Sequence, residues 1–397
     1  MSTATTAVAR ENALVLLWRN KGARAVILQI ITIALLFAFI GYMVRNAVIN
    51  LETIGKGYSF DFLSMPASYD INQTLIEYNS RDSHLRAMYV GILNTLLVAG
   101  CGIFLATIIG FVFGVMRLSR NWLINRIVYC YIEYVRNVPV LLHILLVHGL
   151  LVNILPVPKR AIDWGETFYF TNRGFYVPRP IPEEGFWLTG VTFVIGIAFI
   201  VWFRRYAKGV QDRTGKIYPV FLIGVASVIG LPAVVLMASG MPLSWEIPYI
   251  EGFNFKGGLS LKPEFLALWL ALSFYTSAFI AEIVRAGIMA VSHGQTEAAY
   301  ALGLRPNQTL NLIVIPQALR VIIPPLTSQY LNLTKNSSLA IAIGYMDIIA
   351  TIGGISLNQT GREMECMTLV LAIYLSFSLL ISAFMNWYNK KIKLVEH

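Results

Sequence analysis

The sequence predicts an all-α fold, a polytopic bundle of about eight transmembrane helices. Two observations predict it: the overall composition and the spacing of the apolar runs. Hydrophobic residues make up 56% of the 397 residues and charged residues only 13%, whereas a soluble domain carries about 25% charged residues because its surface must be hydrated. Most of the surface must therefore face lipid. A disordered chain is excluded, because such chains are polar and highly charged.

Apolar runs of about 20 residues, the length that crosses ~30 Å of hydrocarbon, occur eight times. They cover approximately 25–44, 90–116, 127–155, 187–203, 217–239, 265–288, 319–350 and 367–388. The first run has a basic flank but is too long for a signal peptide and lacks a cleavage site, so we expect an uncleaved anchor. The third run contains Asn137 and Pro139, and the seventh contains a polar string at 334–338. We expect both to be broken or partly amphipathic.

The charge distribution predicts the orientation of the helices. Eight spans place both termini on one side, and the segments on that side carry 18 Lys and Arg residues against four acids. The opposite loops carry 11 basic residues against 14 acids. Because basic loops stay on the cytoplasmic side, we expect both termini in the cytoplasm. The net charge of +10 then reflects topology, and no nucleic-acid partner is expected.

Several features indicate helix packing and ordered loops. Gly110 and Gly114 are spaced as in close transmembrane helix contacts. The outer loops at about 45–89, 156–186 and 241–263 mix Pro, Gly, aromatic and acidic residues. We expect these loops to form compact, ordered caps.

The sequence offers little for metal or covalent chemistry. Cys101, Cys130 and Cys366 lie in or beside apolar stretches and have neither disulfide nor zinc spacing. His143 and His148 are expected to be packed within their span, with functional roles the less favoured alternative, and they also lack metal-ligand spacing. A phosphate-binding Gly-x-x-x-x-Gly-Lys-Ser/Thr loop is absent from the sequence. ATP would therefore have to be hydrolysed by another chain, and we expect no catalytic site or cofactor here.

The inner segment between the sixth and seventh spans is the most informative. Thr296 is placed to cap a helix whose first turn holds Glu297, an acid favoured at the positive end of the helix dipole. Two alanines follow, Gly303 suits a left-handed stop, and Pro306 suits the first turn of another helix. A well-capped re-entry loop would explain this pattern. So would a helix presented to a groove on a cytoplasmic partner.

A resemblance to a known family bears on this choice. The sequence Glu-Ala-Ala, three residues, Gly, nine residues, then Ile-x-x-Pro resembles the EAA signature of the transmembrane subunits of bacterial ABC importers. The matching residues are Glu297, Ala298, Ala299, Gly303, Ile313 and Pro316. The resemblance implies the permease fold of type I ABC importers. It also implies that the loop is the coupling helix that docks into the ATPase, with contacts from Gln295, Glu297, Ala298, Ala299, Leu302, Gly303 and Leu304.

Further segments narrow the resemblance. Residues 133–139, 279–288, 316–320 and 335–339 are similar to stretches of the polar amino-acid permeases. The extra first span and the additional helical pair at about 187–239 look like the larger general L-amino-acid permease subunits, which resemble one another in pairs. The implied organisation is an N-terminal tail, extra span and outer loop (1–89), a permease domain (90–388, with its core at about 90–155 and 264–388) and a cytoplasmic tail (389–397).

Charged residues inside the spans are candidates for a substrate pathway, because intramembrane ions usually face a bundle interior or a watery cavity. Glu133 and Arg136, and likewise Glu282 and Arg285, are three residues apart and share a helix face. Each pair could be an internal ion pair that orients its helix. The alternative is a lining that meets the ammonium and carboxylate groups of a zwitterion.

The polar string of the seventh span is the other candidate. If the helix is interrupted there, Lys335 and the exposed amides would offer a seat for a carboxylate; alternatively, the lysine satisfies backbone carbonyls. The expected cavity residues are Glu133, Arg136, Asn137, Glu282, Arg285, Lys335, Asn336, Ser337 and Ser338. Asp347, near the end of this span, is expected at the interface.

The function that the resemblance implies is translocation of L-amino acids across the bacterial inner membrane by alternating access. The implied partners are an ABC ATPase dimer that holds ATP and Mg²⁺, a second permease subunit of related sequence, a periplasmic binding protein that delivers the amino acid, and membrane lipid. An ion-coupled secondary transporter also has broken helices and buried charges and is the alternative. An intramembrane enzyme is disfavoured because the sequence holds no recognisable catalytic constellation.

Overall fold

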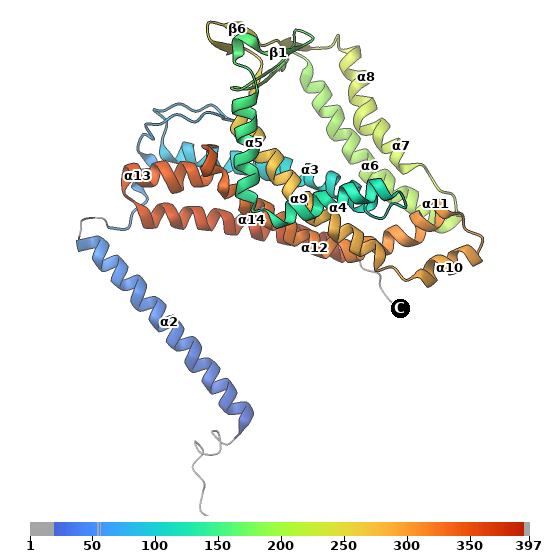
Figure 1. The fold of residues 1–397 in the computed structure, drawn as a ribbon, viewed down its shortest axis with the longest axis horizontal. Helices are drawn as coiled ribbons and strands as arrows, with labels where there is room; N and C mark the ends of the chain where they lie inside the picture. Colours follow the sequence, from blue (N-terminus) through green and yellow to red (C-terminus); the bar gives the residue numbers. More distant parts are fainter. Residues whose placement is uncertain (1–19, 54, 56, 393–397) are drawn as a thin grey trace, which may run out of the picture.

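The computed structural model describes residues 20–53, 55 and 57–392. It is predominantly helical (Figure 1). Seven of the described helices are long and apolar enough to cross a membrane, or eight if one bent pair counts as a single span. The expected helix bundle is thus confirmed. Most of the N-terminal tail and residues 393–397 of the C-terminal tail lie outside the described residues.

The first span forms one continuous helix, α2 (Lys21–Thr53). Its apolar side chains are exposed along its length, and it stands apart from the other helices (Figure 1). A helix that is apolar on all sides requires lipid or another protein chain around it.

The centre of the bundle is the contact between α3 (His84–Met116) and α9 (Pro263–Met289). Two glycines of α3 allow the backbones of these helices to approach each other closely. A Cβ atom added at Gly110 would lie 2.5 Å from Cβ of Ile280, and one added at Gly114 would lie 2.6 Å from Cβ of Val284. The close approach expected from the glycine spacing is confirmed, because no larger residue fits at either position.

The remaining core helices surround this pair. They are α4 (Trp122–Asn137), α5 (Val140–Ile154), α11 (Pro306–Thr309), η4 (Leu310–Val314), α12 (Ile315–Asn336), η5 (Ser337–Ile343), η6 (Ile349–Ser356), α13 (Leu357–Thr360) and α14 (Glu363–Ile392). The expected break in the third span is confirmed, since α4 and α5 meet at an angle of 108°. Val138 is extended there, as a residue before proline must be.

The seventh span behaves differently from the prediction. The helix runs through Thr334 and Lys335 to Asn336 and then tightens into the 3₁₀ helix η5. The chain thus does not unwind at Lys335, but the α-helix does end within the polar string, and the span is interrupted only at the left-handed Gly344. The hydroxyl of Thr334 donates to the carbonyl of Tyr330 (2.9 Å) and that of Ser337 to the carbonyl of Thr334 (2.7 Å). Because these polar groups bond back to their own helix, they do not require a break.

The additional helical pair consists of α6 (Phe186–Thr214) and the continuous run of α7 (Val220–Val225), η3 (Ala226–Gly230) and α8 (Leu231–Ala238). Helix α6 extends 11 residues beyond the predicted end at 203, so most of the inner loop expected at 204–216 is helical. Gly196 lets the backbone of Ser227 approach α6 closely, because an added Cβ would overlap the carbonyl of Ser227.

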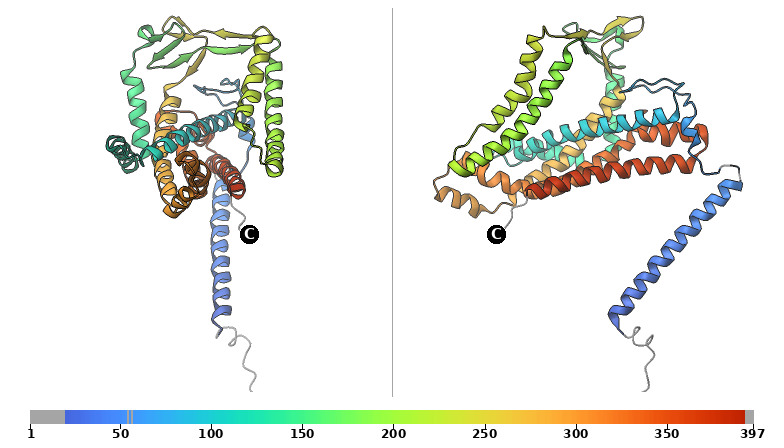
Figure 2. Two further views of the ribbon diagram at one scale, coloured as in Figure 1. Left: turned by 90° about the vertical axis from the view of Figure 1, so that its right-hand side faces the viewer. Right: turned by 180° about the vertical axis from the view of Figure 1, so that it is seen from behind.

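The outer caps contain eight short strands, which the sequence analysis did not predict. Strands β1 (Ile162–Trp164), β2 (Phe168–Thr171), β3 (Gly174–Val177) and β8 (Leu259–Leu261) form an antiparallel sheet. Strands β4 (Arg179–Pro182) and β5 (Leu243–Glu246) pair, as do β6 (Tyr249–Glu251) and β7 (Asn254–Lys256). This β cap joins α5 and α9 to the additional pair at one end of the molecule (Figure 2).

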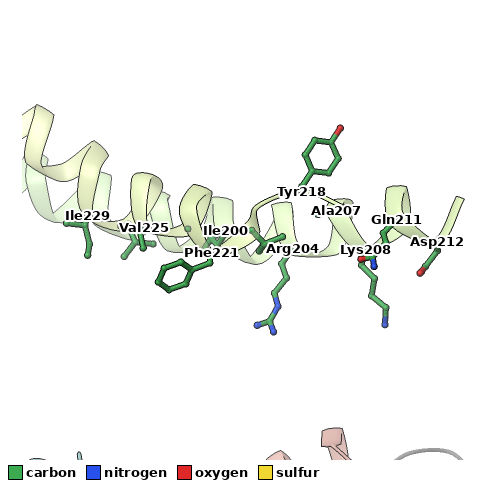
Figure 3. A pocket seen from close by; sticks show the side chains of 13 residues that line it. Ile200, Arg204, Ala207, Lys208, Gln211, Asp212, Tyr218, Phe221, Val225 and Ile229 are labelled. Carbon is green, nitrogen blue, oxygen red and sulfur yellow. The ribbon is translucent and has the colours of Figure 1, made fainter. Parts of the chain in front are cut away.

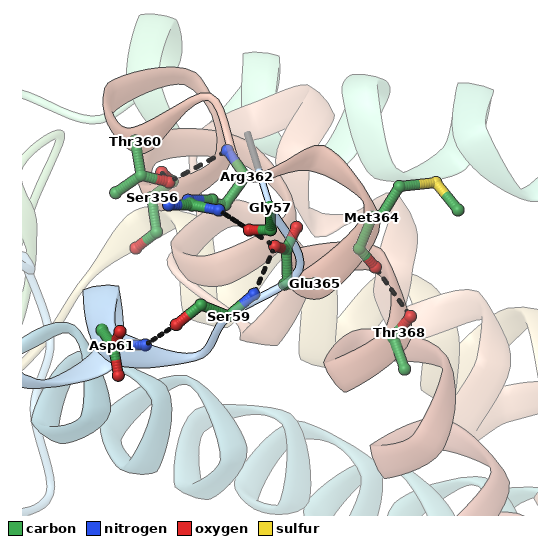
Figure 4. A network of polar contacts seen from close by, with 9 residues as sticks. All are labelled: Gly57, Ser59, Asp61, Ser356, Thr360, Arg362, Met364, Glu365 and Thr368. Carbon is green, nitrogen blue, oxygen red and sulfur yellow. Dashed lines mark hydrogen bonds and ion pairs between the residues drawn. The ribbon is translucent and has the colours of Figure 1, made fainter. Parts of the chain in front are cut away.

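A polar network ties the segment after α2 to the start of α14 (Figure 4). The carboxylate of Glu365, almost fully buried, accepts a hydrogen bond from the backbone N–H of Ser59 at 3.0 Å. Arg362 pairs with the same carboxylate at 3.4 Å and donates to the carbonyl of Gly57. The network fixes one end of the outer loop that was expected to be ordered.

Filling the glycine contact should destabilise the bundle. We expect Gly110→Val to lower stability by about 1–3 kcal/mol, the usual cost of overpacking, measured as a fall in the melting temperature of the purified protein in detergent. Gly100→Val is the matched control, because Gly100 lies on the same helix and an added Cβ there meets nothing within 4 Å. Equal melting temperatures for the two variants would contradict the assigned packing.

Candidate functional site

The inner segment singled out in the sequence forms the helix α10 (His293–Ala301). It begins four residues earlier than predicted, with Ser292 rather than Thr296 at its N-cap position. The expected placement of Glu297 in the first turn is also wrong. Glu297 lies one turn after His293 on the same face, and its Oε1 is 2.9 Å from Nδ1 of His293.

The turn that ends α10 is as predicted. Gly303 is left-handed, with φ of +76°, and the backbone N–H of Leu304 donates to the carbonyl of Ala299 at 3.1 Å. A residue with a side chain would be strained at this φ. Pro306 then opens α11 at its first position, where the missing N–H has no helical partner to lose.

Helix α10 has one face against its own chain and one face exposed. Ala299 is only 1% exposed, and Nε2 of Gln317 on α12 donates to Oε1 of Gln295 at 3.2 Å. Glu297 and Ala298 are exposed, and Leu302 is 80% exposed. The segment therefore packs against α11 and η4, is hydrogen-bonded to α12 through Gln317, and leaves Glu297, Ala298 and Leu302 exposed. Helix α10 lies at the end of the molecule away from the β cap (Figures 1 and 2).

One of the two predicted charge pairs forms. Nη2 of Arg285 lies 2.5 Å from Oε1 of Glu282, and Nε lies 3.1 Å from both carboxylate oxygens. The side chains are about one-third exposed, 29% for Arg285 and 32% for Glu282. The pair stands near the C-terminal end of α9, which ends at Met289, four residues before α10 begins.

The other pair does not form. Within the described chain, Glu133 and Arg136 are not within ion-pair distance of each other. The guanidinium of Arg136 lies 5.7 Å from the ring centre of Phe279. Nδ2 of Asn137 donates to the carbonyl of Glu133 at 2.7 Å. Arg136 and Asn137 are exposed at the end of α4, where the cation contacts an aromatic face in place of a carboxylate.

A small polar cavity of about 270 Å³ lies between α9 and α12. It is lined by Tyr275, Thr276, Phe279, Gln329, Asn332 and Asn336. Of the nine residues expected to line a substrate cavity, Asn336 is the one that borders this cavity. Lys335 is exposed, Ser337 is buried and Ser338 is half-buried. The signal that sequence reasoning missed is the spacing of Gln329, Asn332 and Asn336, which puts three amides on one face of an apolar helix.

Asp347 corrects another expectation. It was expected at the membrane interface, but it is fully buried. Its Oδ1 accepts the backbone N–H of Ala350 at 2.9 Å, and its Oδ2 accepts the hydroxyl of Tyr374 at 3.2 Å. These bonds allow the carboxylate to be buried, because it caps the turn between η5 and η6.

The histidines of α5 show no sign of a metal site. His143 is buried, with its ring 5.6 Å from that of Tyr134 and 5.8 Å from that of Tyr275. His148 is half-buried. No group of three or more potential metal ligands occurs in the part of the chain that the structure describes.

Comparison with known proteins identifies the family. Residues 102–394 match the family described as "Binding-protein-dependent transport system inner membrane component". The chain belongs to this family. It is therefore a multi-pass inner-membrane protein, as the apolar helices also indicate.

Individual relatives agree with this assignment. The chain is 47% identical over 373 residues to the general L-amino acid transport system permease protein AapQ of Rhizobium johnstonii, covering 94% of this chain and 93% of the relative. It is 47% identical over 408 residues to the glutamate/glutamine/aspartate/asparagine transport system permease protein BztB of Rhodobacter capsulatus, covering 94% of each. A solved structure titled as an amino acid ABC transporter with histidines overlaps 78% of this chain and 95% of its own, with a TM-score of 0.46 and 20% identity.

The family assignment confirms the resemblance drawn from the inner loop. The chain has the mostly helical fold of ABC importer permeases, with the β cap added to it, and is a permease subunit, so it is not the subunit that hydrolyses ATP. The family implies partnership with an ATPase and with a second permease subunit. An ion-coupled secondary transporter is not favoured.

The Glu282–Arg285 pair can be tested by neutralising its members singly and together. Arg285→Gln leaves a carboxylate without its counter-ion near the membrane, and Glu282→Gln leaves a cation, whereas the double variant leaves neither. We expect each single change to cost about 1–2 kcal/mol, less than in a fully buried pair because solvent reaches both groups, and the double variant to be more stable than either. Melting temperatures of the three purified variants measure this. Additive losses would show that the two residues do not stabilise each other.

Proposed function

We propose that this chain is a transmembrane subunit of an ATP-driven importer of L-amino acids. The observation that carries the proposal is the exposed face of α10, on a loop that matches the EAA signature and is fixed to α12 through Gln317 and Gln295. The amino-acid class is supported by relatives that match over almost their full length and are named as amino-acid permeases.

In this proposal α10 is the coupling helix. Glu297, Ala298 and Leu302 would contact the ATPase, while Gln295, Ala299, Gly303 and Leu304 would shape the segment. Because Ala299 is buried and Gly303 has a positive φ, these two residues would determine how the segment folds. ATP and Mg²⁺ would be held by the ATPase dimer, and this chain would hold no cofactor.

The cavity between α9 and α12 is the proposed part of the substrate pathway. Its amides and its tyrosine can donate to a carboxylate and accept from an ammonium group, which are the two ends of an amino-acid zwitterion. Asn336, which borders the cavity, would contact the substrate directly. Glu133, Arg136, Asn137, Glu282, Arg285, Lys335, Ser337 and Ser338, also expected from the sequence, would need another transport state to line it.

The proposal also covers the membrane orientation of the chain, its partner proteins and its domain organisation. We place both termini in the cytoplasm, on the basis of the basic inner segments. The second permease subunit would be a homologous but different chain, and a periplasmic binding protein would deliver the amino acid on the side of the β cap. The permease core would comprise 90–155 and 264–388 of a domain at 90–388, with an insertion at 187–239, the segment 1–89 before it and the tail 389–397 after it.

Leu302 offers a specific test of coupling, because it is 80% exposed and its replacement should not disturb the fold. In the complete transporter reconstituted in liposomes, we expect Leu302→Asp to reduce ATP hydrolysis stimulated by the liganded binding protein by roughly tenfold or more, since a charge would replace an apolar docking contact. Leu302→Met, which keeps the apolar volume, should retain it. Stimulated hydrolysis at the unaltered level in Leu302→Asp would refute the docking role.

A further inference from the structure

A groove of about 860 Å³ lies between α6 and the run of α7 and η3, away from the α9–α12 cavity (Figure 3). Its floor is made of small residues: Ala207 is buried between the helices, and an added Cβ at Gly224 would lie 3.2 Å from Cγ1 of Ile200. Small side chains at a helix contact leave a hollow that their larger neighbours border. The groove is therefore open along the surface of the helical pair.

The two ends of the groove differ in chemistry. One end is bordered by the exposed side chains Phe221, Val225 and Ile229. The other end carries Arg204 and Lys208, one helical turn apart on α6, whose side chains extend to the same side as the ring of Phe221 (Figure 3). Asp212 also borders this end, so the groove combines an apolar channel with two cations and one carboxylate.

Aromatic side chains indicate at what depth in the membrane the apolar end of the groove meets its basic end. The rings of Trp202 and Tyr206 stack at 5.7 Å, and the ring of Tyr218 lies 6.5 Å from that of Tyr206. Trp and Tyr gather at the boundary between hydrocarbon and head groups. Arg204 and Lys208 lie on either side of Tyr206 in the sequence, so this rule would place their charges at the depth of lipid phosphates.

The end of the helical pair that carries the two cations, where α6 ends, lies on the side of α10 and opposite the β cap (Figures 1 and 2). Residues 204–216 carry five basic residues and one acid, Asp212. In the described part of the chain, no carboxylate lies within ion-pair distance of Arg204 or Lys208. The positive charges at this end of the groove are therefore available to bind an anion.

We propose that this groove binds an anionic phospholipid of the inner leaflet. Arg204 and Lys208 would hold the phosphate, and an acyl chain would lie along Phe221, Val225 and Ile229. Cations at a membrane surface attract anionic head groups, and their long stems can follow apolar surface while the charges stay at the interface. A transmembrane helix of another subunit could cover the apolar end, but it would satisfy both cations only if it carried carboxylates at the same level. The inference rests on the proposed orientation and is independent of substrate and coupling.

Native mass spectrometry of the complete transporter in detergent tests the proposal. The complex is supplied with phosphatidylglycerol or with zwitterionic phosphatidylethanolamine, and the lipid retained is counted. We expect retained phosphatidylglycerol to exceed retained phosphatidylethanolamine. Arg204→Gln/Lys208→Gln should weaken that retention by about 30-fold, from roughly 1 kcal/mol for each basic residue at the membrane surface.

Arg205→Gln/Arg213→Gln is the matched control, because it removes the same charge from the same segment at positions that do not line the groove. It should retain phosphatidylglycerol. If both double variants lost phosphatidylglycerol equally, retention would depend only on net charge, and the proposed site would be refuted. Equal retention of both lipids would overturn the requirement for an anion. Disulfide cross-linking of Phe221→Cys to another subunit would show a protein in the groove and would also overturn the proposal.

Discussion

The close contact of α3 with α9 is the constraint on which the rest of the bundle depends. Two helices can approach this closely only where one of them lacks side chains, and Gly110 and Gly114 provide that surface opposite Ile280 and Val284. Helix α9 is the most enclosed of the described spans, and α4, α5 and α12 pack against it. Since α9 leads into α10 after three residues, the glycine contact also sets where the inner segment leaves the membrane.

The proposed coupling and the proposed pathway share the same two helices. Helix α9 borders the polar cavity with Tyr275, carries the Glu282–Arg285 pair nearer its inner end and continues toward α10. Helix α12 contacts α10 through Gln317 and borders the cavity with Asn332 some four turns later. Displacement of α10 by an ATPase would therefore act on both walls of the cavity at once. No other described helix joins the two places so directly, which makes this pair the proposed route of transmission.

The sequence predicted features that arise from long or local patterns. Spans of 20 apolar residues, the glycine spacing on α3, the break at Pro139 and the turn at Gly303 each follow from a chemical rule that few tertiary contacts override. The strands of the β cap were missed because each has only three or four residues, too few for an alternating pattern. The helix start at Ser292, the continuous helix at Lys335 and the buried Asp347 were also missed. The burial of Asp347 depends on a hydrogen bond from Tyr374, which lies elsewhere in the fold. Thr334 and Ser337 bond back to carbonyls of their own helix, and Ser292 makes no side-chain cap hydrogen bond, so neither position carries a capping or break signal in the sequence.

The most direct test of the account is a cross-link between α10 and the ATPase. In a chain whose three native cysteines are replaced, a cysteine at position 302 should form a disulfide with a cysteine in the surface groove of the ATPase when the transporter is assembled. A cysteine at position 249, on the β cap, should form none. A cross-linked product containing both subunits, specific to position 302, is the expected result. Labelling of position 302 by a membrane-impermeant thiol reagent added from the periplasmic side, without any cross-link to the ATPase, would contradict it.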